Sequence, residues 1–332
     1  MQPFLSQTSE RPALTDDIRE DVAEPRRSLL AGGLRLLSVN KRLLLWLWLA
    51  NLLCGLFATL PFSGHIAGYL DHSLAAQQIA GRVDLGYVAE LMQQAGKHGA
   101  ISATPPLLSI ALFTLINFVL AGGSLFVFFS GAPAHLSVVA DAGLRYFWRF
   151  VRLTAVATIT LGLSLWLLST LRDVWLTHAG RTHVGAAFFW RAAVSFAIMF
   201  LVALLLRFYF DLAEAVVVQM GLAEDRRVRR SFLTAFGLLR RNFFRAFFGY
   251  FLVGTIGVAL FALALWIWVA ALSPYSTAVA FLLGQFGIAA LLAGRLWQRA
   301  SLAYLVMLRD AATRATVVIE PPRDAAELRA IW

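Results

Sequence analysis

Six apolar runs, each about as long as a bilayer is thick, constrain this sequence more than any other feature. They lie at about residues 43–62, 105–129, 153–171, 186–210, 246–272 and 278–308. A helix of roughly 20 apolar residues crosses the hydrocarbon core, so each run is long enough for one span. Transmembrane β-strands would instead appear as short segments of alternating polarity. The sequence therefore predicts an all-α fold, a polytopic integral membrane bundle of six transmembrane helices.

Composition agrees with this class. Hydrophobic residues make up 59% of the 332 residues, and the mean hydropathy is +0.71. Soluble domains usually stay near about 45–50% apolar. The single cysteine, Cys54, lies inside the first run, so an intrachain disulfide is excluded and we interpret Cys54 as a packing residue.

Three parts of the chain are expected to differ in order. Residues 1–28 are polar and acidic and contain three prolines, which predicts a disordered cytoplasmic tail. No apolar segment follows a short basic start there, so we do not expect a cleaved signal peptide. Residues 29–316 form the predicted transmembrane domain, beginning with an interfacial amphipathic helix at 29–42. Residues 317–332 form a second cytoplasmic tail, and residues 63–104 a long outer loop.

The distribution of basic residues predicts the orientation. The net charge is +10, and 24 of the 29 Lys and Arg residues fall on the side of the N-terminus if six spans are threaded. Basic residues concentrate in cytoplasmic loops, so both termini should be cytoplasmic. Nucleic-acid binding is disfavoured because the basic residues lie between spans and not on a separate folded module.

Three basic segments that precede the odd-numbered spans resemble one another, and we call them elbows. They read GLRLLSVNKRLLLW from Gly33, GLRYFWRFVRLTA from Gly143 and GLLRRNFFRAFFGY from Gly237. The last two share an Arg-x-Phe-aromatic-Arg pattern, at 145–149 and 241–245. Either three related helix hairpins are joined by cytoplasmic interfacial helices, or unrelated segments have converged, since Arg and aromatic residues both favour head-group depth.

The third elbow also carries a family resemblance. Residues 215–253 read AVVVQMGLAEDRRVRRSFLTAFGLLRRNFFRAFFGYFLV. Through Val216–Val218, Arg229–Ser231 and Asn242–Arg245 this segment resembles uncharacterised bacterial six-span membrane families related to the membrane domain of glycerophosphodiester phosphodiesterases. Gln219 departs from the pattern, where an acidic residue is common. The resemblance implies a membrane module of unsettled function, without the soluble barrel that carries phosphodiesterase chemistry.

Catalytic motifs are absent from the sequence. There is no Walker loop, no G-x-S-x-G and no H-E-x-x-H. We therefore predict no enzyme activity, no catalytic residues, no cofactor and no metal site. Five histidines fall in the predicted outer loops, but their spacing matches no helical ligand pair. Glycine pairs inside spans five and six are interpreted as helix-packing positions: Gly254, Gly257, Gly284 and Gly287.

One helix face in span four carries ionisable residues. Arg207, Asp211 and Glu214 lie within about 60° of each other at 100° per residue. Charged groups in hydrocarbon are costly, so they are usually paired, interfacial or functional. The face is either an ion-paired helix end or the lining of a cavity with a proton or ion site. The candidate partners are Arg295 and Arg299 on span six, with Asn117 in span two as a further polar candidate.

The third elbow is the candidate lipid-binding segment. Its apolar residues recur at helical three- and four-residue spacing: Phe232, Leu233, Phe236, Leu239 and Phe243. Its basic residues are Arg226, Arg227, Arg229, Arg230, Arg240, Arg241 and Arg245. An apolar stripe with a cationic remainder predicts an interfacial helix that binds anionic lipid. Alternatively, these arginines serve only to orient the protein during insertion.

Two functions remain open at this level. The first is a non-enzymatic inner-membrane module, a scaffold, assembly or lipid-organising protein that acts through its basic amphipathic elbows. Its partners would be the lipid bilayer, anionic lipids and a membrane protein. The alternative is a transporter or permease component with a polar site formed by spans four and six. Because most spans are uniformly apolar and the charges gather at the inner edge, the sequence favours the first function.

Overall fold

The computed structural model describes residues 28–70, 104–182, 186–223, 228–271 and 277–319, and all regular structure there is helical. The helices are α2 (Leu29–Val39), α3 (Arg42–Leu70), α6 (Thr104–Ser130), α7 (Leu136–Thr182), α8 (Ala186–Leu222), α9 (Val228–Ala271) and α10 (Thr277–Ile319). The predicted all-α membrane fold is confirmed at this level. Most of both predicted tails, and the greater part of the predicted outer loop at 63–104, lie outside the described residues.

Five helices, α6 to α10, are long and apolar enough to cross a membrane. Helix α2 and the first part of α3 reach that standard only as a pair, and the two are bent by 75° at the break between them. Within the described residues the structure therefore supports a multi-pass membrane protein with five such helices, or six if the bent pair counts as one span.

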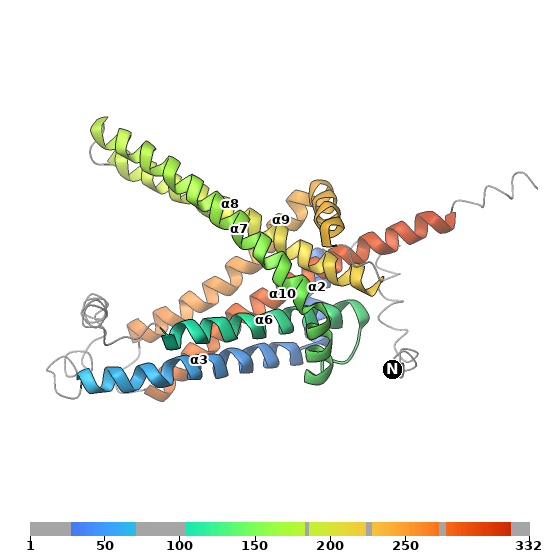
Figure 1. Cartoon of the computed structure of the whole chain (residues 1–332), viewed down its shortest axis with the longest axis horizontal. Coiled ribbons are helices and arrows are strands. Elements are labelled where there is room, and N and C mark those ends of the chain that lie inside the picture. The colour runs from blue at the N-terminus through green and yellow to red at the C-terminus, as the bar shows by residue number, and fades with distance from the viewer. Residues whose placement is uncertain (1–27, 71–103, 183–185, 224–227, 272–276, 320–332) are drawn as a thin grey trace, which may run out of the picture.

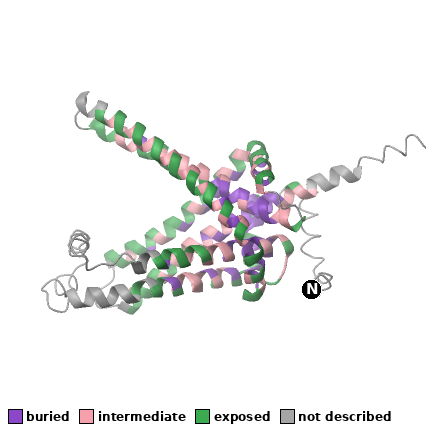
Figure 2. Cartoon of the chain, viewed as in Figure 1, coloured by how far each residue is buried: buried purple, intermediate pink, exposed green. Residues whose placement is uncertain are grey.

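The helices converge at one end of the molecule and diverge at the other (Figure 1). Helices α7 and α8 form a long hairpin that points away from α3, α6, α9 and α10. Buried residues gather where the helices meet, whereas the diverging parts are mostly exposed (Figure 2). We call the meeting point the convergent end. The outer parts of the hairpin, residues 155–177 and 188–206, are here called the α7–α8 arm.

In α7 an elbow and a span share one helix, where the sequence predicts separate segments. Helix α7 runs unbroken from Leu136 to Thr182, although an elbow at 131–152 and a span at 153–171 were expected. No proline interrupts this stretch, and isolated glycines inside it weaken a helix without ending it. Helix α3 likewise continues past Pro61 to Leu70. Helix α8 continues beyond the predicted span end at residue 210 to Leu222, which agrees with the prediction that this helix runs on past the membrane interface.

Two of the three elbows bend at an asparagine. Asn40 separates α2 from α3, and its side-chain amide donates to the carbonyl of Leu36 at 3.0 Å. Asn242 has non-helical dihedrals inside α9, and its amide donates to the carbonyl of Leu238 at 3.5 Å. A helix end leaves carbonyls short of donors, and an asparagine side chain supplies one locally. The equivalent position in α7 is the buried Phe150, and α7 continues without a break.

The three elbows share one pattern of burial, which supports the interpretation as related hairpins but in a different register. Gly33 and Gly143 match Ala235 and not Gly237, so the Arg-x-Phe-aromatic-Arg segments at 145–149 and 241–245 are not at equivalent positions. The pattern runs over residues 29–47, 139–157 and 231–250, with one extra residue after Asn242. Equivalent buried triplets are Leu36, Tyr146 and Leu238, and then Leu43, Leu153 and Ala246. Equivalent exposed triplets are Leu34, Leu144 and Phe236, and then Arg42, Arg152 and Arg245.

Each elbow packs against an even-numbered span of another hairpin: α2 on α10, the start of α7 on α6, and the start of α9 on α8. Trp297 of α10 donates its indole N–H to the carbonyl of Leu30 at 3.0 Å. At the equivalent place, the Tyr209 hydroxyl of α8 donates to the carbonyl of Phe232 at 3.1 Å. The three hairpins thus follow one another around a closed ring.

Glycines allow two of these contacts to be close. A Cβ atom on Gly33 of α2 would overlap Ser301 of α10, and a Cβ atom on Gly143 of α7 would overlap the carbonyl of Val119 on α6. Helix α2 therefore buries its Gly32–Gly33 face on α10, where an apolar face toward the lipid had been predicted. A face of small residues can approach another backbone more closely than lipid tails can, which explains the preference.

Candidate functional site

The strongest polar contact in the convergent end joins α8 to α10. Arg295 reaches Asp211 with both terminal nitrogens, Nη2 to Oδ1 at 2.6 Å and Nη1 to Oδ2. The Asp211 side chain is buried, and that of Arg295 is about three-quarters buried. A two-pronged arginine–carboxylate pair is among the strongest hydrogen-bonded arrangements in proteins. The pair therefore fixes both the distance and the rotation of α8 against α10.

Tyr250 brings α9 into the same cluster. Its hydroxyl donates to Oδ2 of Asp211 and accepts from Nη1 of Arg295 at 2.9 Å. The side-chain amide of Gln298 on α10 donates to the backbone carbonyl of Tyr250 at 2.9 Å. The ring of Phe208, which is fully buried, lies 5.1 Å from the Tyr250 ring. Three spans are thus tied together by one network that apolar side chains shield from water.

A second ion pair lies one helical turn further along. Arg299 Nη2 stands 3.6 Å from Oε2 of Glu214, and both side chains are at least about 85% buried. This distance is an ion pair without a hydrogen bond. Glu214 Oε2 and Arg299 Nε are buried with no hydrogen-bond partner among the described residues. The Asp211–Arg295 pair is therefore joined by hydrogen bonds. In the Glu214–Arg299 pair, Oε2 of Glu214 can still accept a hydrogen bond and Nε of Arg299 can still donate one.

The predicted pairing of span four with span six is confirmed by these contacts. Two of the predicted residues stay outside the cluster. Arg207 is exposed, because it immediately precedes the buried stretch 208–218 of α8. Arg207 lies on the same helix face as Asp211, so its position along α8, and not the face it occupies, explains why it is exposed. Asn117 donates to the carbonyl of Phe113 in its own helix at 3.2 Å, so this polar candidate bonds within α6 and not to the cluster.

Sequence reasoning missed Tyr250 and Gln298. The sequence places Tyr250 in an aromatic entry into span five, and a tyrosine in such a segment gives no sign of its partner. Gln298 carries a usable signal, since it stands between Arg295 and Arg299 on one face of an apolar span. Polar residues at i, i+3 and i+4 in a membrane helix indicate a face turned toward protein.

The predicted lipid-binding elbow lies on the first part of α9. Arg226 and Arg227 lie outside the described residues, and the other five arginines are exposed: Arg229, Arg230, Arg240, Arg241 and Arg245. The expected single apolar stripe is wrong, because it is split between two directions. Leu233 and Phe236 are exposed, whereas Phe232, Leu239 and Phe243 are partly buried. The buried face consists of Ser231, Ala235 and Leu238, which allow α9 to lie close to its neighbours.

Among the residues that the structure describes, no three His, Cys, Asp or Glu side chains gather as a metal site would require. The packing interpretation of the span-five and span-six glycines is confirmed for Gly254, Gly257 and Gly287, which lie against the facing helix. Gly284 has open space around it. No protein family, curated protein or solved structure matches the chain.

Proposed function

We propose that this protein is a non-enzymatic membrane module that organises lipid, or holds a partner protein, at the cytoplasmic face of a bacterial inner membrane. The observation that carries the proposal is the exposed face of the first part of α9. Exposed Arg240 and Arg241 stand there beside exposed Phe236 and Phe244. Bulky apolar groups at acyl depth with arginines at head-group depth are the features by which interfacial helices hold anionic lipid.

The buried cluster supports a structural role for the bundle. The side chains of Asp211, Arg295 and Tyr250 pair with one another inside the protein, through an ion pair and hydrogen bonds. Such a network holds α8, α9 and α10 in one arrangement and so keeps the α9 elbow at a defined place on the bundle. A rigid bundle with a basic surface suits a scaffold or assembly protein, and the resemblance of residues 215–253 to six-span membrane modules agrees with this.

Replacing Arg240 and Arg241 with Gln tests the lipid-binding part of the proposal. Each basic residue near an anionic surface contributes about 1 kcal/mol, so two lost charges should weaken anionic-lipid retention about ten- to thirty-fold. The measurement is native mass spectrometry of protein from nanodiscs that contain phosphatidylglycerol and phosphatidylcholine. The control is Arg191→Gln, which removes one arginine near the start of α8, on the α7–α8 arm and away from the elbow of α9. Unchanged phosphatidylglycerol retention in the double variant would overturn the proposal.

Six spans with both termini in the cytoplasm form part of the same proposal, supported by the 24 of 29 basic residues on that side. Reporter fusions at Gln94 and His178 should report the outer side. Fusions at Glu224 and after Trp332 should report the cytoplasm. An outer-side signal after Trp332 would require an odd number of spans and would exclude this threading.

A transporter or permease component is the second candidate, favoured by one specific observation. Four ionisable side chains face each other between α8 and α10: Asp211, Glu214, Arg295 and Arg299. Transport would appear as proton flux into proteoliposomes, followed with an internal pH-sensitive dye, that Glu214→Gln abolishes. Flux equal to that of empty vesicles in the parent protein counts against proton coupling at this site.

A further inference from the structure

The bend between α2 and α3 encloses a cavity together with the loop that follows α6. The cavity has a volume of about 210 Å³ and is lined by Val39, Asn40, Lys41, Arg42, Pro133 and Ala134. It depends on the 75° bend, which turns α2 away from the axis of α3. Helix α7, by contrast, runs unbroken through its elbow. The first hairpin therefore has a recess of its own, which needs no likeness to the other two elbows.

Hydrogen bonds fix both walls of this cavity. Gly131 follows the last residue of α6 with a φ of 65°, a left-handed conformation that glycine adopts without strain. In the loop that it begins, the carbonyl of Ala134 accepts from the indole N–H of Trp46 on α3 at 3.1 Å. On the other wall, the buried Asn40 donates to the carbonyl of Leu36 at 3.0 Å. The cavity is therefore a fixed part of the fold.

Two cationic side chains line the cavity without an acidic partner. Lys41 and Arg42 are exposed, and the ion pairs in the described part of the chain all involve other arginines. Helices α2 and α3 and the loop at 131–135 contain no acidic residue. Asp141, the first acidic residue after that loop, is paired with Arg145 at 2.6 Å. No carboxylate of the described residues therefore neutralises the positive lining.

The start of α3 adds backbone donors to this charge. Helix α3 begins at Arg42, and the N–H groups of Leu43 and Leu44 bond back to the turn before it at 2.9 and 3.1 Å. The N–H groups of Lys41 and Arg42 have no partner among the described residues. Phosphate oxygens accept readily from free N–H groups at a helix start and from guanidinium and ammonium groups. The cavity thus offers the donors that a phosphate group binds.

Neighbouring side chains favour a lipid as the source of that phosphate. Trp46 and Trp48 follow Arg42 within two helical turns, and tryptophan is enriched where a span meets the membrane surface. The cavity therefore lies at head-group depth. Val39, which also lines it, is 52% exposed and offers apolar surface to an acyl chain.

We propose that the cavity at the α2–α3 bend binds the phosphate group of one anionic phospholipid, held by Lys41, Arg42 and the start of α3. This site rests on the proposed function, because it belongs to a membrane module that holds anionic lipid. It is separate from the exposed face of α9, and its occupant is bound in a recess of the protein.

The test uses full-length protein in nanodiscs of phosphatidylglycerol and phosphatidylcholine, with retained phosphatidylglycerol counted by native mass spectrometry. Lys41→Gln/Arg42→Gln should weaken retention of one phosphatidylglycerol about ten- to thirty-fold. The matched control is Arg35→Gln/Arg191→Gln, which removes two arginines that do not line the cavity and should retain as much as the parent. Equal retention in the test variant and the parent, or an equal loss in the control, overturns the site.

A second variant leaves the charges in place. Val39→Phe narrows the cavity and should also reduce phosphatidylglycerol retention, while the thermal midpoint in detergent stays that of the parent. Unchanged retention in Val39→Phe would show that the charges attract lipid without a recess, and would overturn the site. A parallel arm adds inorganic phosphate to nanodiscs of phosphatidylcholine alone. A phosphate adduct that Lys41→Gln/Arg42→Gln abolishes, without retained phosphatidylglycerol in the mixed nanodiscs, would identify a free anion as the occupant and overturn the lipid site.

The same measurement separates this site from the proposed function. Full retention in Lys41→Gln/Arg42→Gln with loss in Arg240→Gln/Arg241→Gln would overturn the cavity and leave lipid binding by α9 intact. Loss in Lys41→Gln/Arg42→Gln alone would support the cavity and count against the α9 face. Full retention in both double variants would overturn both.

Discussion

The convergent end and the α7–α8 arm are both made of strongly apolar helices but are built differently. In the most apolar window of Leu136–Thr177 only 6% of residues are buried, compared with 39% in that of Leu108–Ser130. Trp166 and Trp190 on the arm are two-thirds exposed, whereas Phe208 at the convergent end is fully buried. In a bilayer, lipid chains solvate apolar side chains as well as protein does, so hydrophobicity alone does not specify helix packing.

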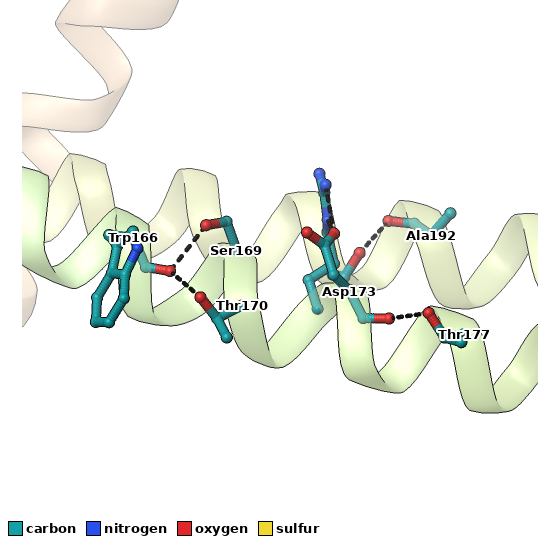
Figure 3. A network of polar contacts seen from close by, with 8 residues as sticks. Trp166, Ser169, Thr170, Asp173, Thr177 and Ala192 are labelled. Atoms are coloured by element: carbon teal, nitrogen blue, oxygen red, sulfur yellow. Dashed lines mark hydrogen bonds and ion pairs between the residues drawn. The ribbon is translucent and has the colours of Figure 1, made fainter.

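The polar groups of the two regions differ in the same way. On the arm, Ser169 and Thr170 both donate to the backbone carbonyl of Trp166, and Thr177 donates to that of Asp173 (Figure 3). These bonds stay within one helix and place no constraint on a neighbour. At the convergent end the polar groups bond between helices. The comparison shows that polar contacts between helices, together with close glycine contacts, mark where the fold is specified.

Breaking the Asp211–Arg295 pair should have the largest effect. Asp211→Ala leaves the Arg295 charge buried without its partner, which should lower the free energy of unfolding by about 3–5 kcal/mol. The measurement is thermal unfolding in detergent, with Arg295→Ala and the double variant completing a cycle. Effects of the two single variants that simply add would show that the pair does not hold α8 to α10.

The arm provides the control for that experiment. Arg172 donates to the exposed carboxylate of its neighbour Asp173 at 2.8 Å. Because Asp173 is largely exposed, Asp173→Ala should cost about 0.2–1 kcal/mol. A loss as large as that of Asp211→Ala would mean that the arm is held by polar contacts as strongly as the convergent end.

Substitution of two glycines of α7 by alanine should change the free energy of unfolding by an intermediate amount, in opposite directions. Gly143 lies against the backbone of Val119, so Gly143→Ala forces α6 and α7 apart and should destabilise by about 1–3 kcal/mol. Gly162, on the arm, has nothing within 4 Å of an added Cβ. Gly162→Ala should therefore stabilise by about 0.5–1 kcal/mol through helix propensity. Circular dichroism melts of both variants would test this, and equal effects would contradict the contrast between the two regions.

Exposed aromatic residues of the arm should have the smallest effect on stability. Trp166→Ala should change the free energy of unfolding by less than about 0.5 kcal/mol, as is usual for an exposed position. Phe208→Ala, at the convergent end, should cost about 3–5 kcal/mol. If Trp166→Ala instead lowers the thermal midpoint as much as Phe208→Ala, another protein surface and not lipid covers the arm.

Sequence by itself determined the class of this protein and gave the candidates for its ionic partners. Apolar runs of this length are expected to form membrane helices, because in a bilayer the backbone groups of a helix all find their hydrogen-bond partners within that helix. The same cost of burying charge made Arg295 and Arg299 the candidate partners of Asp211 and Glu214. The helical period and the basic pattern also located the elbows, although Asn40 and Asn242 alone do not show which elbow bends.

Only the tertiary structure decided which apolar surfaces meet protein and which are exposed. Phe208 and Trp166 read alike in sequence, and one is buried while the other is exposed. It also decided that Tyr250 joins the charged cluster and that Arg207 does not. The physical reason is that a bilayer satisfies an apolar side chain wherever it points, so hydrophobic patterning carries little information on packing. Close backbone approach at residues such as Gly33 and Gly143, and polar contacts between helices, carry that information, and both depend on segments far apart in the chain.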